Sequence, residues 1–226
     1  MAWVIGDVHG CIKTLKALLN KIPKDDKVIF VGDLMDRGPN SKEVIQLIKE
    51  NNYDCVRGNH EVAMCDVILD LLADNSLVKS SYWVNTWGGM ETLKSYGNCT
   101  KEEVIFDVQW LESLPYYIEY KDIKNKDGRY LVVSHSSIGD VWEMRNLDKD
   151  SFEYQDFIAQ ITNNRINHPK DIKEIYNIHG HTPHKEALIT DYYADADTGA
   201  CYEKLGNLTA IEFPSLRIIS QENIDK

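Results

Sequence analysis

The sequence predicts an α/β fold that forms one domain over residues 1–226. In the first half, short apolar runs alternate with segments of helical period, and the second half is richer in strand-like runs. A chain of 226 residues with 43% hydrophobic and 27% charged residues fits a single globular domain with a sizeable core. No low-complexity linker or repeat divides it, so we expect no second domain.

Three strand–helix units make up the first seventy residues. The expected strands are Ala2–Gly6, Lys27–Val31 and Tyr53–Arg57, and the expected helices are Cys11–Asn20, Ser41–Glu50 and Glu61–Ala73. The first helix carries Ile12, Leu15 and Leu18 on one face. This order favours parallel strands covered by helices, and such sheets bind ligands beyond the carboxyl ends of their strands.

The remainder of the chain is more strand-like. Thr100 to Glu103 has the pattern of a capping box, which predicts a helix that ends before Pro115. A turn signal at 125–128 predicts a hairpin. The expected strands are 116–120, 129–134, 175–178, 187–194, 208–213 and 216–220, and a further helix is expected within 148–164. Residues 74–99 are rich in aromatic side chains, which either line a substrate groove or pack a helical insertion.

Charge and cysteine content exclude several classes of function. The net charge of -11 argues against a nucleic-acid partner, because binding to phosphate backbones needs a basic surface. The five cysteines are odd in number and form no Cys-x-x-Cys pair, which favours a reducing, cytoplasmic compartment. Asp7 and His9 interrupt the apolar start, so we expect no signal peptide, and no apolar run is long enough to span a membrane. The sequence specifies no oligomeric state.

Four segments carry possible metal ligands. In Gly6–Gly10, Gly32–Gly38, Gly58–Glu61 and His179–Thr182, an apolar run leads into a glycine turn that holds Asp, Asn or His. Together with a histidine after the run 131–134, the candidate ligands are Asp7, His9, Asp33, Asn59, His135 and His181. Each residue alone is typical of a turn, a helix cap or a buried histidine. Together they are typical of a hydrolytic centre with two metal ions.

The order of these ligands suggests how they are shared. Asp7 and His9 are two residues apart, so along an extended strand end they would point the same way and bind one ion. Asp33 has two carboxylate oxygens and can bridge two ions. Asn59 offers a neutral carbonyl oxygen, and it would bind the second ion with His135 and His181.

These blocks resemble the phosphoprotein phosphatase branch of the calcineurin-like metallophosphoesterases. The matching segments are Gly6–Gly10, Gly32–Gly38, Arg57–Glu61, Val133–His135, His179–Pro183, Asp197–Ala200 and Gly206–Thr209. The sequence is most similar to the small bacterial and phage members of the lambda type, over essentially the whole chain. The resemblance implies a sandwich of two mixed β-sheets flanked by helices.

The resemblance also implies roles for residues that are not metal ligands. His60 would be the general acid that protonates the leaving oxygen, Asp36 would orient it, and Arg37 would bind phosphate oxygens. A second phosphate-binding arginine is expected, and Arg165 is the best candidate. The family usually has tryptophan two residues before this arginine, where Asn163 stands here, so Arg145 is a rival.

The expected activity is metal-dependent hydrolysis of phosphomonoesters, by direct attack of a hydroxide that bridges two metal ions. The expected cofactors are two divalent ions, with manganese as the best candidate and iron or zinc as alternatives. The resemblance favours a serine/threonine protein phosphatase that acts on phosphorylated proteins or small phosphoesters. A symmetrical dinucleoside tetraphosphate hydrolase is the main alternative, because it shares these motifs. A non-catalytic scaffold on the same fold is a remote one, because every ligand and His60 are present.

Overall fold

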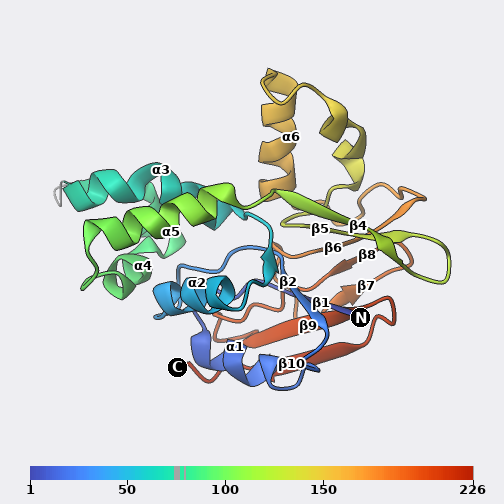
Figure 1. Ribbon diagram of the computed structural model, residues 1–226, viewed down its shortest axis with the longest axis horizontal. Helices are drawn as coiled ribbons and strands as arrows, with labels where there is room; N and C mark the ends of the chain where they lie inside the picture. The colour runs from blue at the N-terminus through green and yellow to red at the C-terminus, as the bar shows by residue number, and fades with distance from the viewer. Residues whose placement is uncertain (74–76, 79, 226) are drawn as a thin grey trace.

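Two mixed five-stranded sheets pack face to face in the computed structural model, which describes residues 1–73, 77–78 and 80–225 (Figure 1). The first sheet has the order β10-β9-β1-β2-β3, with β1 Ala2–Ile5, β2 Lys27–Phe30, β3 Asp54–Cys55, β9 Asn207–Phe213 and β10 Ile218–Glu222. The second has the order β4-β5-β6-β8-β7, with β4 Tyr117–Lys124, β5 Tyr130–Ser134, β6 Ile175–His179, β7 Leu188–Ile189 and β8 Tyr193–Asp195. This is the sandwich that the resemblance implies.

Helices pack on the outer side of each sheet, and several of them project beyond the sheets at the left of Figure 1. Those beside the first sheet are α1 Ile12–Leu19, α2 Ser41–Glu50, α3 Asn59–Ala73, the π-helix η2 Trp83–Trp87, α4 Gly89–Ser95 and α5 Lys101–Ser113. Those beside the second sheet are the 3₁₀ helix η3 Gly139–Asn146 and α6 Phe152–Asn163. No helix in the described part of the chain has the length and apolar character needed to cross a membrane.

The central strands are buried on both faces, and alternate side chains enter different cores. In β1, Trp3 and Ile5 pack against the helices, whereas Ala2 and Val4 pack between the two sheets. β5 follows the same rule on the other side of the sandwich, because Val132 packs against η3 and α6 while its neighbours face the first sheet. Continuous apolar runs of this kind are therefore strands with no solvent face.

The structure confirms the expected parallel pairing of β1, β2 and β3 and changes the bounds of other elements. The helix after β3 begins at Asn59, two residues earlier than expected, and β10 begins at Ile218. The run 187–194 is two short antiparallel strands, β7 and β8, because Thr190 closes a turn with Tyr193. The region 74–99 contains η2 and α4, which the sequence does not assign, and its residues 74–76 and 79 lie outside the described part.

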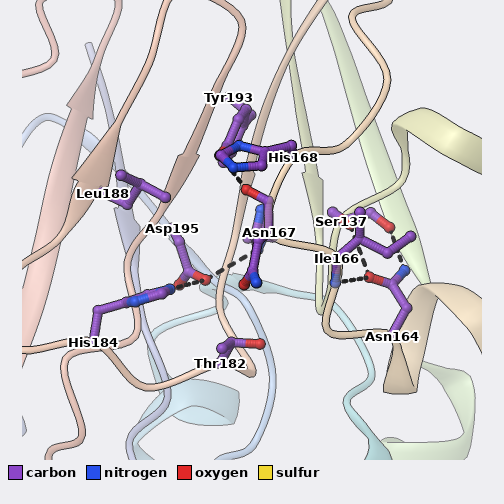
Figure 2. A pocket seen from close by; sticks show the side chains of 11 residues that line it. Ser137, Asn164, Ile166, Asn167, His168, Thr182, His184, Leu188, Tyr193 and Asp195 are labelled. Carbon is purple, nitrogen blue, oxygen red and sulfur yellow. Dashed lines mark hydrogen bonds and ion pairs between the residues drawn. The ribbon is translucent and has the colours of Figure 1, made fainter.

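A cavity of about 260 Å³ opens beside the ends of β6 and β8 (Figure 2). Its walls come from the loop after β5, the loop after α6 and the segment 179–195. The loops after β5 and β6 also carry two of the candidate metal ligands, His135 and His181. The cavity is therefore a neighbour of the candidate metal centre.

Candidate metal centre

The six candidate ligands converge where the parallel strands of the two sheets end. Asp7 and His9 follow β1, Asp33 follows β2, Asn59 begins α3 directly after β3, and His135 and His181 follow β5 and β6. All six side chains are buried. The two sheets thus bring together residues that are more than 170 positions apart in the chain.

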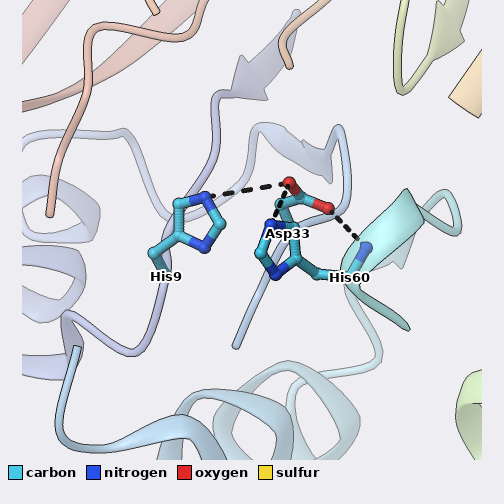
Figure 3. A group of neighbouring side chains, drawn as sticks. All are labelled: His9, Asp33 and His60. Atoms are coloured by element: carbon cyan, nitrogen blue, oxygen red, sulfur yellow. Dashed lines mark hydrogen bonds and ion pairs between the residues drawn. The ribbon is translucent and has the colours of Figure 1, made fainter. Parts of the chain in front are cut away.

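One group of ligand atoms surrounds a single oxygen of Asp33 (Figure 3). The Nε2 atoms of His9 and His60 each lie 3.7 Å from Oδ2 of Asp33. Nδ1 of His9 donates to the carbonyl oxygen of Met35 at 2.7 Å, which fixes the tautomer of the ring. Nε2 therefore carries a lone pair that can bind a metal. The atoms of His9, Asp33 and His60 therefore form one group, whereas the ligands that the sequence predicts for this ion are Asp7, His9 and Asp33.

A second group surrounds Nε2 of His135. This atom lies 2.9 Å from Oδ1 of Asn59, 3.0 Å from Nδ1 of His181 and 3.4 Å from Oδ1 of Asp33. Nδ1 of His135 donates to the carbonyl oxygen of Val31 at 2.8 Å, so Nε2 carries a lone pair. Lone pairs of oxygen and imidazole nitrogen thus converge on one buried point, and a cation would satisfy all of them.

The electrostatics of the site suit a cation as well. Burial lowers the pKa of His181 to about 3, with a further contribution from His135. Burial also lowers the pKa values of His9 and His135, so these rings are neutral at pH 7 and can act as ligands. Burial alone would raise the pKa of Asp33, but the surrounding histidines bring it below its usual range. The residues present therefore fit two divalent cations that share Asp33.

Asp7 reaches the centre in a different way from the expected one. The chain after β1 is not extended, because His9 has a φ of 46°. The strand end expected at His9 is therefore absent, and the assignment of Asp7 and His9 to one ion stays a prediction. Oδ1 of Asp7 accepts the backbone N–H of His181 at 3.2 Å. Burial and the nearby carboxylates of Asp197 and Asp33 raise the pKa of Asp7, a repulsion that a bound cation would relieve.

The loops of the site have strained backbones. Seven described residues other than glycine have positive φ, and five of them are His9, Asp33, Asp36, Arg37 and His181. Such conformations cost on the order of 1–3 kcal/mol each and persist where the surrounding structure imposes them. Glycines allow the close packing, because a Cβ at Gly58 would overlap Oδ1 of Asp33 and one at Gly180 would overlap Oδ1 of Asp7.

Glu61 holds two of these loops together, a role that the sequence does not reveal. Its carboxylate accepts the backbone N–H groups of Asp33 at 2.9 Å, Leu34 at 2.8 Å and Gly58 at 2.8 Å. The side chain is fully buried, and burial raises its pKa to about 7. An acidic residue in the first turn of a helix is the available signal, but it predicts only a local cap.

His60 is held by a buried carboxylate. Its Nδ1 lies 2.6 Å from Oδ2 of Asp36, and the indole N–H of Trp83 donates to the same oxygen at 2.7 Å. The hydroxyl of Thr92 donates to the other oxygen of Asp36 at 2.5 Å. Burial would lower the pKa of His60, but Asp33 and Asp36 raise it above its usual value. A protonated ring of this kind can donate a proton to a leaving group.

Arg37 lies against both histidines of the first group. Its Nη2 is 3.0 Å from Nε2 of His60, and its Nη1 contacts Nε2 of His9. The guanidinium also lies 5.3 Å from the centre of the Tyr202 ring. A cation and Arg37 therefore compete for the lone pair of His9, and the guanidinium is within reach of any anion bound at the centre.

Two arginines compete for the role of second phosphate ligand, and the structure separates them. Arg165 donates from Nη1 to the carbonyl oxygen of His181 at 3.0 Å, so it lies at the edge of the centre. Arg145 stacks on the Trp142 ring at 3.7 Å and lies 3.8 Å from Glu174. This geometry favours Arg165.

The aromatic side chains of 82–96 divide between the two expected roles. Trp83 and Tyr96 are buried, and the Tyr96 hydroxyl donates to Asp107 at 2.9 Å. The ring of Trp87 lies 5.2 Å from that of His60, and the exposed ring of Tyr82 lies 6.3 Å from Trp87. Part of the insertion is therefore core, and part borders the site.

Comparisons with known proteins place the chain in a family. The profile of the family described as calcineurin-like phosphoesterase matches residues 2–211. Bis(5′-nucleosyl)-tetraphosphatase PrpE (asymmetrical) of Oceanobacillus iheyensis is 27% identical over 241 residues, which cover 96% of this chain and 90% of that protein. Serine/threonine-protein phosphatase 1 of Salmonella typhimurium is 33% identical over 122 residues, which cover 53% of this chain and 52% of that protein.

A solved structure described as that of a candidate diadenosine tetraphosphatase has the same fold. It matches with a TM-score of 0.69 at 20% identity, over 100% of this chain and 94% of the other. The family profile spans nearly the whole chain and includes every candidate metal ligand. This protein therefore belongs to the calcineurin-like phosphoesterase family.

Proposed function

We propose that this protein hydrolyses dinucleoside tetraphosphates at a centre that binds two divalent metal ions. The observation that carries the proposal is how much of the chain its tetraphosphatase relatives match. Proteins named bis(5′-nucleosyl)-tetraphosphatase are 27% and 28% identical over 96% of this chain, and the chain covers 90% and 92% of their lengths. The protein-phosphatase relative matches about half of each chain. The sequence alone favours phosphoproteins, so the full-length relatives reverse the order of the two candidates.

The same relatives support cleavage at one end of the tetraphosphate. They are named asymmetrical, which means that the products are unequal, a nucleoside monophosphate and a nucleoside triphosphate. The dinucleotide hydrolase that the sequence offers as its main alternative is the symmetrical enzyme, which would release two nucleoside diphosphates. The chain's net charge of -11 offers no general attraction to a polyanion, so Arg37 and Arg165 would have to attract the phosphates locally.

The metal ions would be held by the six ligands described above. Asp7, His9 and Asp33 would bind one ion, and Asp33 would bind the other with Asn59, His135 and His181. When bound, divalent cations lower the pKa of coordinated water and withdraw charge from phosphoryl oxygens. Mixed carboxylate and imidazole donors suit manganese, iron or zinc, and we propose manganese.

The protein's own side chains would complete the chemistry. Asp36 holds the ring of His60 by its Nδ1–H, so that Nε2 faces the centre and can give a proton to the leaving phosphate oxygen. Arg37 and Arg165 would donate to the equatorial oxygens of the phosphoryl group, whose charge grows in the transition state. His60 thus acts as an acid and not as a ligand, although its Nε2 lies near Asp33.

A direct comparison of substrates tests the proposal. Diadenosine tetraphosphate and a phosphothreonine peptide would be assayed with the same enzyme, manganese concentration and pH, and the products separated by chromatography. We expect kcat/KM to be at least about tenfold higher for the dinucleotide, with AMP and ATP formed in equal amounts. A preference of about tenfold for the peptide would support the second candidate, the protein phosphatase. Formation of two equivalents of ADP would show that the cleavage is symmetrical and not asymmetrical.

A further inference from the structure

Three segments that line the cavity of about 260 Å³ in Figure 2 also carry residues of the candidate site. Ser137 lies two residues after the ligand His135, and Thr182 directly follows His181. Asn164 and Ile166, which also line the cavity, flank the phosphate-binding candidate Arg165. Asn164 is fixed there, because it accepts from the Ser137 hydroxyl at 2.8 Å and donates to the Ser137 carbonyl at 2.7 Å. A group bound in the cavity would thus lie beside the segments of the chain that carry His135, His181 and Arg165.

The walls of the cavity suit an uncharged ring with polar edges. Ile166, Leu188 and Tyr193 supply apolar and aromatic surface. Asp195 is 2% exposed and lies 3.3 Å from Nε2 of His184, so its charge has a partner (Figure 2). The eleven described lining residues include no lysine or arginine. The cavity therefore lacks the charges that would hold a second phosphate, and its histidine and amide side chains offer both donors and acceptors.

One buried polar atom on the cavity wall lacks a partner. His179 is 5% exposed, and its Nε2 has no hydrogen-bond partner among the described residues. The ring stacks on Tyr193, with centroids 5.8 Å apart and planes 12° apart. A buried polar atom of this kind is completed in folded proteins by an ordered water or by a bound molecule, and a ligand in the cavity could supply the partner.

We propose that this cavity binds the nucleoside whose own phosphate is hydrolysed. The inference rests on the proposed function, because a dinucleotide has a base attached to each end of its phosphate chain. The volume is below the roughly 300–1,000 Å³ of pockets that enclose a drug-sized ligand, so it admits one base and not a whole dinucleotide. The base would lie against Tyr193 and Ile166, with Asp195 and His184 at its polar edge and its 5′ phosphate at Arg165.

This placement also accounts for unequal products. Because the residues on either side of Arg165 line the cavity, the phosphorus nearest the nucleoside would be the one at the centre. Water would form a bond to that phosphorus, and the bond from it to the next bridging oxygen would break. The water's oxygen and one of its protons remain on the monophosphate, and the triphosphate leaves with a proton from His60. The water's second proton then restores the protonated form of His60.

A bulky substitution tests the site with a matched control. Ile166 is 37% exposed at the cavity, and Leu147 is 41% exposed outside it, so tryptophan at either position has room on the surface. For Ile166→Trp, we expect the ratio of kcat/KM for diadenosine tetraphosphate to that for p-nitrophenyl phosphate to fall at least about tenfold. For Leu147→Trp, the ratio should stay at the wild-type value. An unchanged ratio in Ile166→Trp would overturn the inference and leave the proposed function intact.

Binding of adenosine tests the cavity without any hydrolysis. Adenosine carries no phosphate, so its binding does not depend on the reaction. In metal-loaded protein, we expect adenosine to shift the methyl resonances of Ile166 and Leu188 in a saturable way, and to leave those of Leu147 unchanged. If diadenosine tetraphosphate is not a substrate, the proposed function fails, but this titration still decides the site. Absence of shifts up to millimolar adenosine would overturn the inference, as would equal losses of phosphopeptide and dinucleotide hydrolysis in Ile166→Trp.

Discussion

Oδ2 of Asp36 lies 2.6 Å from Nδ1 of His60. Both side chains are buried, and the same carboxylate receives hydrogen bonds from Trp83 and Thr92, so its position does not depend on His60 alone. A carboxylate that is fixed in this way sets the orientation and the tautomer of the imidazole ring. The relationship therefore supports His60 as the proton donor of the reaction.

Replacing His60 with asparagine should separate chemistry from metal binding. We expect kcat to fall by roughly 10²–10⁴, because the leaving oxygen loses its proton donor. Elemental analysis should still find two metal ions per chain in His60→Asn. Loss of an ion from this variant would instead make His60 a ligand, as its 3.7 Å distance from Asp33 permits.

Trp83→Phe should slow catalysis without unfolding the insertion. The substitution removes the indole N–H that donates to Asp36 and keeps an aromatic ring in the core. We expect kcat to fall about 10–100-fold with little change in KM or metal content, as is typical of residues that position a catalytic group. Trp142→Phe is the matched control, because the Trp142 indole also donates to a carboxylate, that of Glu174, at 2.8 Å. Equal losses in the two variants would show a general effect on folding.

Asp33→Asn should reduce the binding of both metal ions. The carboxylate of Asp33 belongs to both groups of ligand atoms, and an amide offers one neutral oxygen in place of two charged ones. We expect metal analysis to find one ion per chain or fewer. Asp122→Asn removes an exposed carboxylate in β4 and should retain two ions. Two tightly bound ions in Asp33→Asn would disprove a shared carboxylate.

Glu61→Gln should destabilise the fold even without metal. Glutamine cannot accept all three backbone N–H groups that Glu61 accepts, so one donor would be left unsatisfied in a buried place. We expect the free energy of unfolding in urea, measured on chelated protein, to fall by about 1–3 kcal/mol. Glu103 also accepts a backbone N–H, that of Thr100, but is exposed, so Glu103→Gln should cost less. A loss in Glu61→Gln no larger than in this control would refute its clamping role.

The sequence predicts much of the fold because its patterns are local. The continuous apolar run Ala2–Ile5 identifies a buried strand, and the periodic apolar residues of Ser41–Glu50 identify a helix. The convergence of the candidate ligands is also predictable, because Asp33 and His135 each follow an apolar run, and strand ends are where such sheets bind ligands. The run 187–194 is misassigned because its strand-like composition does not distinguish one strand from two joined by a turn at Thr190.

The contacts that support the site are not predictable in this way. Trp83 and Thr92 are 47 and 56 residues away from Asp36 in the chain, and no local pattern links them. The sequence identifies Glu61 only as a residue in the first turn of a helix. Its partners Asp33 and Leu34 lie about 28 residues earlier, in the loop after β2. Such contacts depend on how elements pack in three dimensions, which a single sequence does not specify.

The number of metal ions needed for activity tests the central claim most directly. Protein would be stripped by a chelator, checked by elemental analysis and titrated with manganese while the hydrolysis of p-nitrophenyl phosphate is measured. The two groups of ligand atoms that share Asp33 predict no activity in metal-free protein and full activity only as two ions per chain are bound. Full activity in verified metal-free protein, or saturation at one ion per chain, would contradict the account.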